Sequence, residues 1–519
     1  MRNTMQSETL LEKLHTIDRE YRHLEKAIAL LQWDQETYLP AKGVEERSEQ
    51  LALLEGIAHE RLTGSETKGL LEALGSGSQN PKGDENLPPI ERDFLKVMRR
   101  NYDRAVQLPA DFVRDAARAE GLSQAAWADA RRNNDFSTFL PHLTVMLDYA
   151  KKKAEYRGFR SGAGGDVYDS LLDIYEPGMT AHDISAVFDP LRDRLAALLR
   201  KIASCPQPDD SFLNQDYAID EQARFNRELI DRLGFDTTRG RLDISAHPFT
   251  NSLGSDDVRI TTRYCKNNLL SSIFSVIHES GHAFYDMGFP HEIRSTCLAN
   301  GSSMAIHESQ SRFWENVIGR SSPFWKHLFP LLLSHFPGQL RRIHTADFYR
   351  AVNSVRPSLI RVDADEVSYS LHIILRFELE KQLFSGSLSP EDLPSVWRQQ
   401  MKTVLGIEPE TDADGVLQDI HWSMGAFGYF PSYALGNLYG LHIWKRLRAE
   451  LPNLEDAISQ GRFEALHTWL RENIYTWGCR LDPAELLTRL TGEKLSALPF
   501  VEYLEEKYTS LYGLETGTE

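Results

Sequence analysis

The sequence predicts a mainly helical fold, all-α except for one small β-sheet. Apolar residues recur at helical spacings nearly throughout the 519 residues, which is typical of helices packed on a core. Strand-like alternation is confined to roughly Arg241–Tyr264, where Ile244, Val258 and Ile260 alternate with polar residues. No solenoid repeat is visible. These observations favour one domain over residues 1–519, built as a single large or bilobed helical body.

The expected N-terminal lobe covers residues 1–204. It consists of long amphipathic helices, for example from Leu10 to Gln32 and from Glu91 to Ala119. The segment Cys205–Asp210 contains two prolines and is interpreted as a linker. Residues 211–519 form the expected catalytic lobe. Its small sheet would flank the metal-binding helix described next, where a peptide backbone could bind as an added strand.

The segment His278-Glu279-Ser280-Gly281-His282 predicts a metal-dependent hydrolase. Histidines at positions i and i+4 share one face of a helix and can bind one metal ion, and the glutamate between them lies close enough to act on a water molecule there. The helix is expected over Asn268–Asp286, and its apolar residues lie on most sides, so it is buried. Gly281 costs a helix about 1 kcal/mol relative to alanine, which indicates that a substrate or another backbone comes close.

A third metal ligand is expected on a following helix, which begins after the turn Asn300-Gly301-Ser302. Glu308 and His307 are both candidates, because carboxylate and imidazole both bind zinc. Adjacent residues on a helix point about 100° apart, so only one of the two should reach the ion. Glu308 is preferred, because two histidines and a glutamate form an established open hydrolytic site. A second pair, His291-Glu292, is interpreted as solvated surface.

Charge and composition exclude several classes of protein. The net charge is −17, from 58 basic and 75 acidic residues, which argues against nucleic-acid binding. No run of about 18 apolar residues predicts a membrane span, and no secretory leader is visible. The four cysteines are widely spaced without a CxxC pair, and they are interpreted as free thiols of a cytoplasmic protein: Cys205, Cys265, Cys297 and Cys479.

The two segments His278–His282 and His307–Gln310 resemble the paired motifs of the thermostable, Taq-type carboxypeptidase family of metallopeptidases. Leu31–Thr37 is similar to that family's opening helical segment. Four further segments match its motifs in the expected order: His247-Pro248-Phe249, Asp257–Thr261, Ile360–Asp365 and Gly415–Trp422. The resemblance covers nearly the whole chain, and no metal or catalytic position departs from it.

This resemblance implies a zinc- or cobalt-dependent carboxypeptidase with one metal ion per chain, which releases single C-terminal amino acids with broad specificity. It also implies an almost all-helical fold with a deep central substrate groove, and commonly a homodimer. Such a groove would admit only short or unfolded peptides, so cytosolic peptide turnover is the expected task. Glu279 would be the general base beside a metal ion held by His278, His282 and Glu308.

A carboxypeptidase also needs an anchor for the free α-carboxylate of its substrate. Arginine suits this task, because its planar fork binds a carboxylate bidentately. Arg361 is preferred over Arg259, and Asp363 and Asp365 are expected to hold the Arg361 guanidinium group or nearby backbone. Arg259 is interpreted as structural, paired with Asp257 in an edge strand or turn beside the groove.

Donors for the tetrahedral oxyanion are expected in the glycine-loosened aromatic segment His421–Tyr433. Tyr429 is the first choice, and Tyr433 and His421 are alternatives, although aromatic residues at this density also pack in cores. His247 precedes a proline, which restricts its backbone to extended conformations. It is expected to line the groove or to have a core or capping role.

Two other functions share parts of this pattern. An endopeptidase would use the same metal ligands but would not need an α-carboxylate anchor. A helical peptide-binding protein with a vestigial metal site would not need a general base, so the presence of Glu279 argues against it. An aminopeptidase would need an acidic anchor such as G-x-M-E-N, which the sequence lacks.

Overall fold

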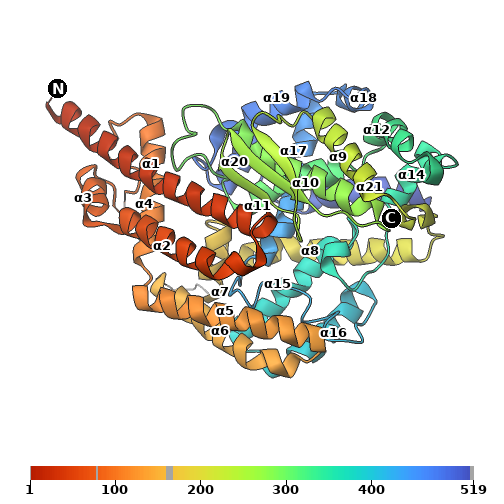
Figure 1. The fold of residues 1–519 in the computed structure, drawn as a ribbon, viewed down its shortest axis with the longest axis horizontal. Helices are drawn as coiled ribbons and strands as arrows, with labels where there is room; N and C mark the ends of the chain where they lie inside the picture. The colour runs from red at the N-terminus through yellow and green to blue at the C-terminus, as the bar shows by residue number, and fades with distance from the viewer. Residues whose placement is uncertain (1, 78–79, 84, 159–166, 515–519) are drawn as a thin grey trace.

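The computed structural model describes residues 2–77, 80–83, 85–158 and 167–514 (Figure 1). It is mainly helical with one three-stranded sheet, as the sequence predicts. The helices before the sheet are α1 (Arg2–Thr37), α2 (Val44–Thr63), α3 (Ser65–Ala73), α4 (Pro89–Val106), α5 (Ala110–Asn133), α6 (Phe136–Tyr156), α7 (Val167–Tyr175), α8 (Ala181–Ala203) and α9 (Ile219–Leu233). The predicted linker at 205–210 contains no helix or strand.

The N-terminal helices differ from the prediction at one point. The helix expected from Leu10 to Gln32 lies within α1. The helix expected from Glu91 to Ala119 is wrong, because α4 ends at Val106 and α5 begins at Ala110. Pro109 is the N-cap residue of α5, and a proline disfavours helical backbone in the residue before it.

The sheet lies where strand-like alternation predicts it, as β1 (Gly240–Ile244), β2 (Thr250–Gly254) and β3 (Asp257–Thr262). Its order is β1-β3-β2, with β1 parallel and β2 antiparallel to β3. Val258 and Ile260 of the central strand are fully buried, whereas Ile244 is exposed. Arg259 therefore lies on the central strand, and its expected place in an edge strand or turn is wrong.

Helix α1 packs against the sheet, beside α2 (Figure 1). The side-chain amide of Asn251 on β2 donates a hydrogen bond to the carbonyl of Ala29, at 2.8 Å. The Trp33 ring contacts two guanidinium groups, with the Cζ atom of Arg259 4.4 Å and that of Arg241 5.2 Å from its centroid. Buried Trp33 thus fixes the end of α1 to neighbouring strands.

The rest of the chain adds α10 (Leu269–Gly288), α11 (Met304–Arg312), a π-helical turn (Phe313–Ile318), α12 (Ser322–His335), α13 (Pro337–Leu340), α14 (Thr345–Val352), α15 (Tyr369–Ser385), α16 (Leu393–Leu405), α17 (Phe430–Glu450), α18 (Leu454–Ser459), α19 (Glu464–Asn473), α20 (Pro483–Thr491) and α21 (Leu498–Tyr512). One hydrophobic cluster runs from Leu11 to Tyr508. Buried hydrogen bonds also join the two expected lobes, for example Tyr168 to Glu380 at 2.5 Å. The division into lobes stays a prediction.

None of the described helices combines the length and the apolar character that a membrane crossing needs. All four cysteines are free thiols, and Cys297 and Cys479 are buried.

Candidate metal centre

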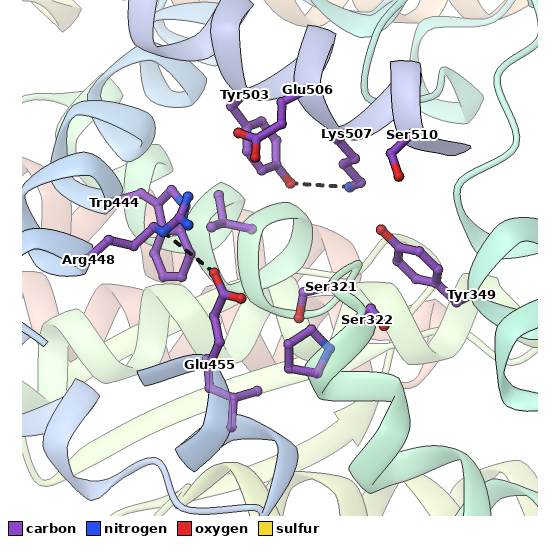
Figure 2. Close-up of a pocket in the computed structure, with 13 residues that line it drawn as sticks. Ser321, Ser322, Tyr349, Trp444, Arg448, Glu455, Tyr503, Glu506, Lys507 and Ser510 are labelled. Carbon is purple, nitrogen blue, oxygen red and sulfur yellow. Dashed lines mark hydrogen bonds and ion pairs between the residues drawn. The ribbon is translucent and has the colours of Figure 1, made fainter. Parts of the chain in front are cut away.

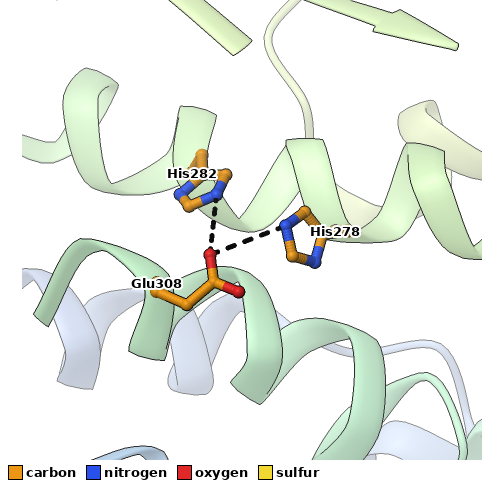
Figure 3. Close-up of side chains that lie close together, drawn as sticks. All are labelled: His278, His282 and Glu308. Carbon is orange, nitrogen blue, oxygen red and sulfur yellow. Dashed lines mark ion pairs between the residues drawn. The ribbon is translucent and has the colours of Figure 1, made fainter. Parts of the chain in front are cut away.

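Two helices bring together three potential metal ligands (Figure 3). Helix α10 carries His278 and His282 one turn apart, and α11 carries Glu308. Ligand atoms of the three side chains all lie within 4.8 Å of one another. Glu308 Oε2 is 3.4 Å from His282 Nε2 and 3.8 Å from His278 Nε2. A tetrahedral ion with bonds of about 2.0–2.2 Å separates its ligand atoms by about 3.3–3.6 Å, so the set fits one metal ion.

Glycines let the helices approach closely enough to form this site. A Cβ atom at Gly281 would lie 2.6 Å from the carbonyl oxygen of Gln310 and 2.6 Å from Cα of Ser311, both on α11. On the other side of α11, a Cβ atom at Gly436 of α17 would lie 2.8 Å from Cγ of Glu308. The expectation that another backbone comes close to Gly281 is therefore confirmed.

A π-helical turn after α11 places Glu315 behind the first histidine. Glu315 Oε2 is 2.8 Å from His278 Nδ1, and a donor at Nδ1 leaves Nε2 free to bind a metal ion. Arg312 joins the two glutamates, with Nε 2.8 Å from Glu308 Oε1 and Nη1 3.3 Å from Glu315 Oε2. Both carboxylates are thereby held in fixed orientations.

The buried carboxylates make this site attractive to a cation. Burial opposes a charge on His278, but Glu308, Glu315 and Glu279 together raise its pKa to about 9. Burial and the neighbouring His307 lower the pKa of His282 to about 4, so this ring is neutral. Burial would raise the pKa of Glu308, but His278 and Arg312 hold it well below its usual range. Glu308 is therefore ionised and able to bind a metal ion.

Glu279 projects from α10 toward the edge strand β2. The hydroxyl of Thr250 donates to Glu279 Oε2 at 2.6 Å and lies 3.0 Å from the Glu279 carbonyl oxygen. The side chain is buried, and burial raises the pKa of its carboxyl, against the effects of His278 and Thr250. A carboxylate whose pKa is raised toward neutrality is suited to general-base chemistry.

His307, the alternative third ligand, lies outside the ligand set. Its Nε2 is 3.2 Å from Asp286 Oδ1. Its ring stacks on His282, with centroids 4.5 Å apart and planes inclined by 23°. Within the described part of the chain, His282 Nδ1 has no hydrogen-bond partner, so the ring is oriented by stacking on His307 and by Glu308 at its Nε2 atom.

Arg361 is buried in a network of charged and aromatic groups. Its Nε and Nη2 atoms each lie 2.9 Å from Asp419 Oδ1, and Nη1 donates to the Tyr369 hydroxyl at 3.0 Å. Asp365 instead accepts from backbone amides, for example that of Val367 at 2.9 Å. The prediction that Asp365 binds nearby backbone is therefore confirmed. The carboxylate that binds the Arg361 guanidinium group is that of Asp419.

Tyr369 connects this network to the metal ligands. The Arg312 guanidinium lies over its ring, with Cζ 4.0 Å from the centroid, and Arg312 is hydrogen-bonded to Glu308. Arg361 contacts the same tyrosine through its hydroxyl. One aromatic side chain thus separates the candidate anchor from the partner of a candidate metal ligand.

The candidate oxyanion donors lie together beside Arg361. Tyr433 Oη is 3.1 Å from His421 Nε2, and the Arg361 Cζ atom is 4.9 Å from the Tyr433 ring centroid. The Tyr429 and Tyr433 rings are in edge contact at 5.2 Å. Burial and then the charge of Glu308 raise the pKa of Tyr429 to about 12, so it remains a protonated donor near the metal ligands.

The segment that carries these residues is held in place at Gly428, so the glycine there permits a turn whose backbone is fixed by hydrogen bonds. Gly428 has φ +87°, a backbone conformation that residues other than glycine rarely adopt. Its amide donates to Glu380 Oε2 at 2.9 Å, while Trp422 Nε1 donates to Glu380 Oε1 at 2.8 Å. Glu380 is completely buried, so these bonds fix the backbone next to Tyr429.

Two predicted residues lie apart from this network. Arg259 forms a bidentate pair with Asp257, with both bonds at 2.9 Å, as predicted for a structural role. His247 is exposed in the connection between β1 and β2, so a core role is wrong. The pair His291-Glu292 is exposed, as predicted.

A separate cavity of about 280 Å³ lies between α12, α17, α18 and α21 (Figure 2). Val317 of the π-helical turn forms part of its wall. Figure 2 shows two polar contacts among its lining residues, the ion pair of Arg448 with Glu455 and the hydrogen bond from Lys507 to the Tyr503 hydroxyl. The metal ligands do not line this cavity.

Several residues of the centre were not predicted from the sequence. Arg312 follows Glu308 by four residues, so the spacing alone predicts that both side chains lie on one face of the helix. Asp419 lies inside a quoted motif segment, Gly415–Trp422, but nothing local pairs it with Arg361. Glu315 and Thr250 depend on a π-helical turn and on a tertiary contact, which leave no local signal.

Comparison with known proteins gives matches over nearly the whole chain. A family model described as carboxypeptidase Taq (M32) metallopeptidase matches residues 13–508. Thermostable carboxypeptidase 1 of Thermus thermophilus is 42% identical over 518 residues, which cover 98% of this chain and 100% of that protein. Carboxypeptidase 1 of Bacillus subtilis is 36% identical over 510 residues, 97% and 100% of the two chains. The crystal structure of the M32 carboxypeptidase from Deinococcus radiodurans R1 has a TM-score of 0.93 at 38% identity, over 98% and 100% of the chains.

Proposed function

The chain belongs to the carboxypeptidase Taq (M32) family of metallopeptidases and is a metal-dependent carboxypeptidase, and from this premise we propose which residues perform the reaction. His278, His282 and Glu308 hold one metal ion per chain. The convergence of two Nε2 atoms and one carboxylate oxygen supports this assignment. The metal is zinc, for which two imidazoles and a carboxylate are a known hydrolytic ligand set, and cobalt would fit the same donors. When bound, the ion supplies Lewis-acid polarisation of the scissile carbonyl and acidifies the attacking water.

Glu279 is the general base of this reaction. It removes a proton from the attacking water and delivers it to the leaving amine. The Thr250 hydroxyl, 2.6 Å from Glu279 Oε2, keeps the carboxylate oriented at the edge of the sheet. Burial raises its pKa, which brings its basicity nearer to that needed for accepting a proton at neutral pH.

Arg361 anchors the α-carboxylate of the substrate, which makes the enzyme an exopeptidase. A guanidinium group has five N–H donors. Asp419 and Tyr369 accept three of them, so two remain for a carboxylate. The ion pair with Asp419 also fixes the direction of the fork before substrate arrives.

Tyr429 donates a hydrogen bond to the tetrahedral oxyanion, and Tyr433 and His421 complete the wall beside it. Tyr429 is half-buried, and the Glu308 charge acts on its hydroxyl, which supports a place near the reacting carbonyl. The Glu380 clamp on Gly428 keeps this donor in position. Arg259 and His247 contribute to the sheet and its connection, outside this contact set.

Broader properties follow from the same premise. We propose a bilobed single domain, with lobes 1–204 and 211–519 around a substrate groove that admits short or unfolded peptides. We further propose a cytoplasmic homodimer with broad specificity. Four free cysteines support a reducing compartment.

The geometry of His278, His282 and Glu308 carries the proposal, and Glu279→Gln tests it. The variant should retain the metal content of the parent protein but lose at least about 100-fold in kcat, because general acid–base catalysis contributes about 10²–10⁴. Glu292→Gln, an exposed glutamate just beyond α10, is the matched control and should remain active. Hydrolysis at the parent rate by the Glu279 variant would refute the mechanism.

The exopeptidase assignment is tested with one peptide as free acid and as C-terminal amide. Mass spectrometry should show successive loss of single residues from the free acid only, because the amide cannot pair with Arg361. Cleavage of both peptides at internal bonds would contradict the role of Arg361.

A further inference from the structure

A second and larger cavity, of about 570 Å³, lies among the N-terminal helices. Its wall is formed by α4, the end of α6, α7 and the turn that leads into α8. The metal ligands and Arg361 are not among its lining residues. This cavity is therefore separate from the residues assigned to the reaction above.

Basic side chains dominate its lining, although the whole chain carries a net charge of −17. Among the residues that the structure describes, five cations line it, against three carboxylates: Lys96, Arg99, Arg100, Arg104 and Arg157 against Asp103, Asp169 and Asp173. The cavity in Figure 2, by contrast, has two cations and two carboxylates. A concave surface with excess positive charge attracts anions.

Most of the cations already have one acidic partner. Arg99 is 2.8 Å from Asp103, and Arg104 is 3.0 Å from Asp173. Lys96 binds Asp482 at 2.7 Å, with Glu485 at 3.7 Å, and both carboxylates lie outside the lining. Asp482 also lies 3.5 Å from Arg100.

Arg157 differs from the other four cations. No ion pair joins it to any residue in the part of the chain that the structure describes, and its buried Nε has no acceptor there. The buried Nε of Arg100 is likewise without an acceptor among the described residues. Burial and then the charge of Arg104 lower the pKa of Arg157, while the charge of Asp173 opposes this effect. The guanidinium groups of Arg157 and Arg104 thus repel each other at the cavity wall. Asp173 offsets part of this repulsion, and a shared anion would relieve the rest.

We propose that this cavity binds an oxyanion of the phosphate class, held chiefly by Arg157, Arg104 and Arg100. Guanidinium groups suit such ligands, because their forked N–H donors match the oxygens of a phosphate. The volume of about 570 Å³ is within the usual range of small-molecule sites. It leaves room for a ligand larger than one phosphate group, such as a pyrophosphate.

Helix α7 connects this cavity to the candidate active site. Asp169 and Asp173 line the cavity, and the same helix ends at Tyr175, whose ring is in edge contact with Tyr429 at 5.0 Å. The next residue, Glu176, accepts a hydrogen bond from the amide of Ala305 in α11 at 2.7 Å. An anion that restrains α7 is therefore expected to alter KM for peptides.

Calorimetric titration of the metal-loaded protein with inorganic phosphate and with pyrophosphate, at constant ionic strength, tests the proposal. The parent protein should bind both, and pyrophosphate more tightly. Arg157→Gln should weaken binding about tenfold or more, because it removes charge-assisted hydrogen bonds. Arg114→Gln removes an equal charge from an exposed position on the adjacent helix α5 and should leave binding unchanged.

Asp173→Asn provides the opposite test. This change removes the acidic partner of Arg104. The backbone amide of Gly178 donates a hydrogen bond to Asp173 Oδ1 at 2.9 Å, and the asparagine side chain keeps an oxygen that can accept it. Phosphate should therefore bind this variant more tightly than the parent. Equal phosphate affinity in the parent, Arg157→Gln and Asp173→Asn proteins would overturn the proposal, because it would place the anion elsewhere, for example at the metal. Absence of binding at millimolar phosphate would overturn it too, and neither result depends on peptidase activity. If phosphate binds without changing KM, the connection through α7 is wrong.

Discussion

Gly281→Ala tests whether the metal centre depends on direct contact between helices α10 and α11. Alanine is the better helix former by about 1 kcal/mol, so helix propensity alone predicts a more stable protein. The new Cβ atom would lie 2.6 Å from two backbone atoms of α11, and ordinary contact begins at 3.4 Å. Because backbone atoms cannot rotate away, the helices must separate by about 0.8 Å.

The magnitude follows from two opposing effects. Overpacking a core costs about 1–3 kcal/mol, and the propensity gain of about 1 kcal/mol offsets part of it. We therefore expect a net loss of stability of about 0–2 kcal/mol. The effect on the metal should be larger, because ligand distances must hold to about 0.2 Å. A shift that carries His278 and His282 away from Glu308 should weaken metal binding about tenfold or more.

Competition titration with a chromogenic chelator measures the metal affinity, and thermal unfolding of the metal-free protein measures stability separately. Gly121→Ala in α5 is the matched control, because no atom lies within 4 Å of the Cβ position there. It should raise stability by up to about 1 kcal/mol and leave metal affinity unchanged. If Gly281→Ala behaves like Gly121→Ala in both measurements, close helix contact is not what builds the site.

Three further changes test other parts of the centre. Glu315→Gln removes the charge behind His278 and should weaken metal binding about tenfold or more, measured by the same titration; unchanged affinity would show that Glu315 does not orient the ligand. Arg361→Lys should raise KM for free-acid peptides about tenfold or more while changing kcat less, because a lysine lacks the forked N–H donors that bind Asp419 and a substrate carboxylate together. An unchanged KM would show that Arg361 is not the α-carboxylate anchor. Burial raises the pKa of Glu176 from 4.5 to about 7, so its stabilising effect is complete below pH 4.5 and is lost as the pH rises through about 7. Glu176→Gln should therefore raise the thermal midpoint above pH 7 and have no such effect below pH 4.5, and a pH-independent difference would contradict this assignment.

Local patterns in the sequence were sufficient for much of the fold. The helix expected over Asn268–Asp286 is α10, and the sheet lies within the expected segment, because side-chain periodicity follows directly from burial on one face. The break between α4 and α5 was also predictable, since Pro109 restricts the backbone before it. The structure groups Glu308, and not His307, with His278 and His282, because adjacent helical residues point in different directions; the role of Glu308 as a ligand stays a prediction.

The remaining features depend on tertiary contacts between distant segments. Arg361 and Asp419 are 58 positions apart in the chain and meet only where the 3-10 turn Arg361–Asp363 and the segment before α17 converge. Glu315 would point elsewhere on a regular α-helix, because a π-helical turn inserts an extra residue per turn. His247 has a constrained backbone, but whether its ring is exposed depends on what covers the connection between β1 and β2.

Helix α11 explains why these contacts occur together. It is packed between α10 and α17, and small residues on both neighbours, Gly281 and Gly436, leave no freedom for it to shift. Glu308, Arg312 and Glu315 follow one another along it and the π-helical turn, so their positions are set by one backbone. A change that displaces α11 must therefore alter the proposed third metal ligand, the support of His278 and the contact of Arg312 with Tyr369, which in turn binds Arg361. Metal affinity and the α-carboxylate contact should accordingly be lost together in packing variants of α11, but separately in variants of Glu315 and Arg361.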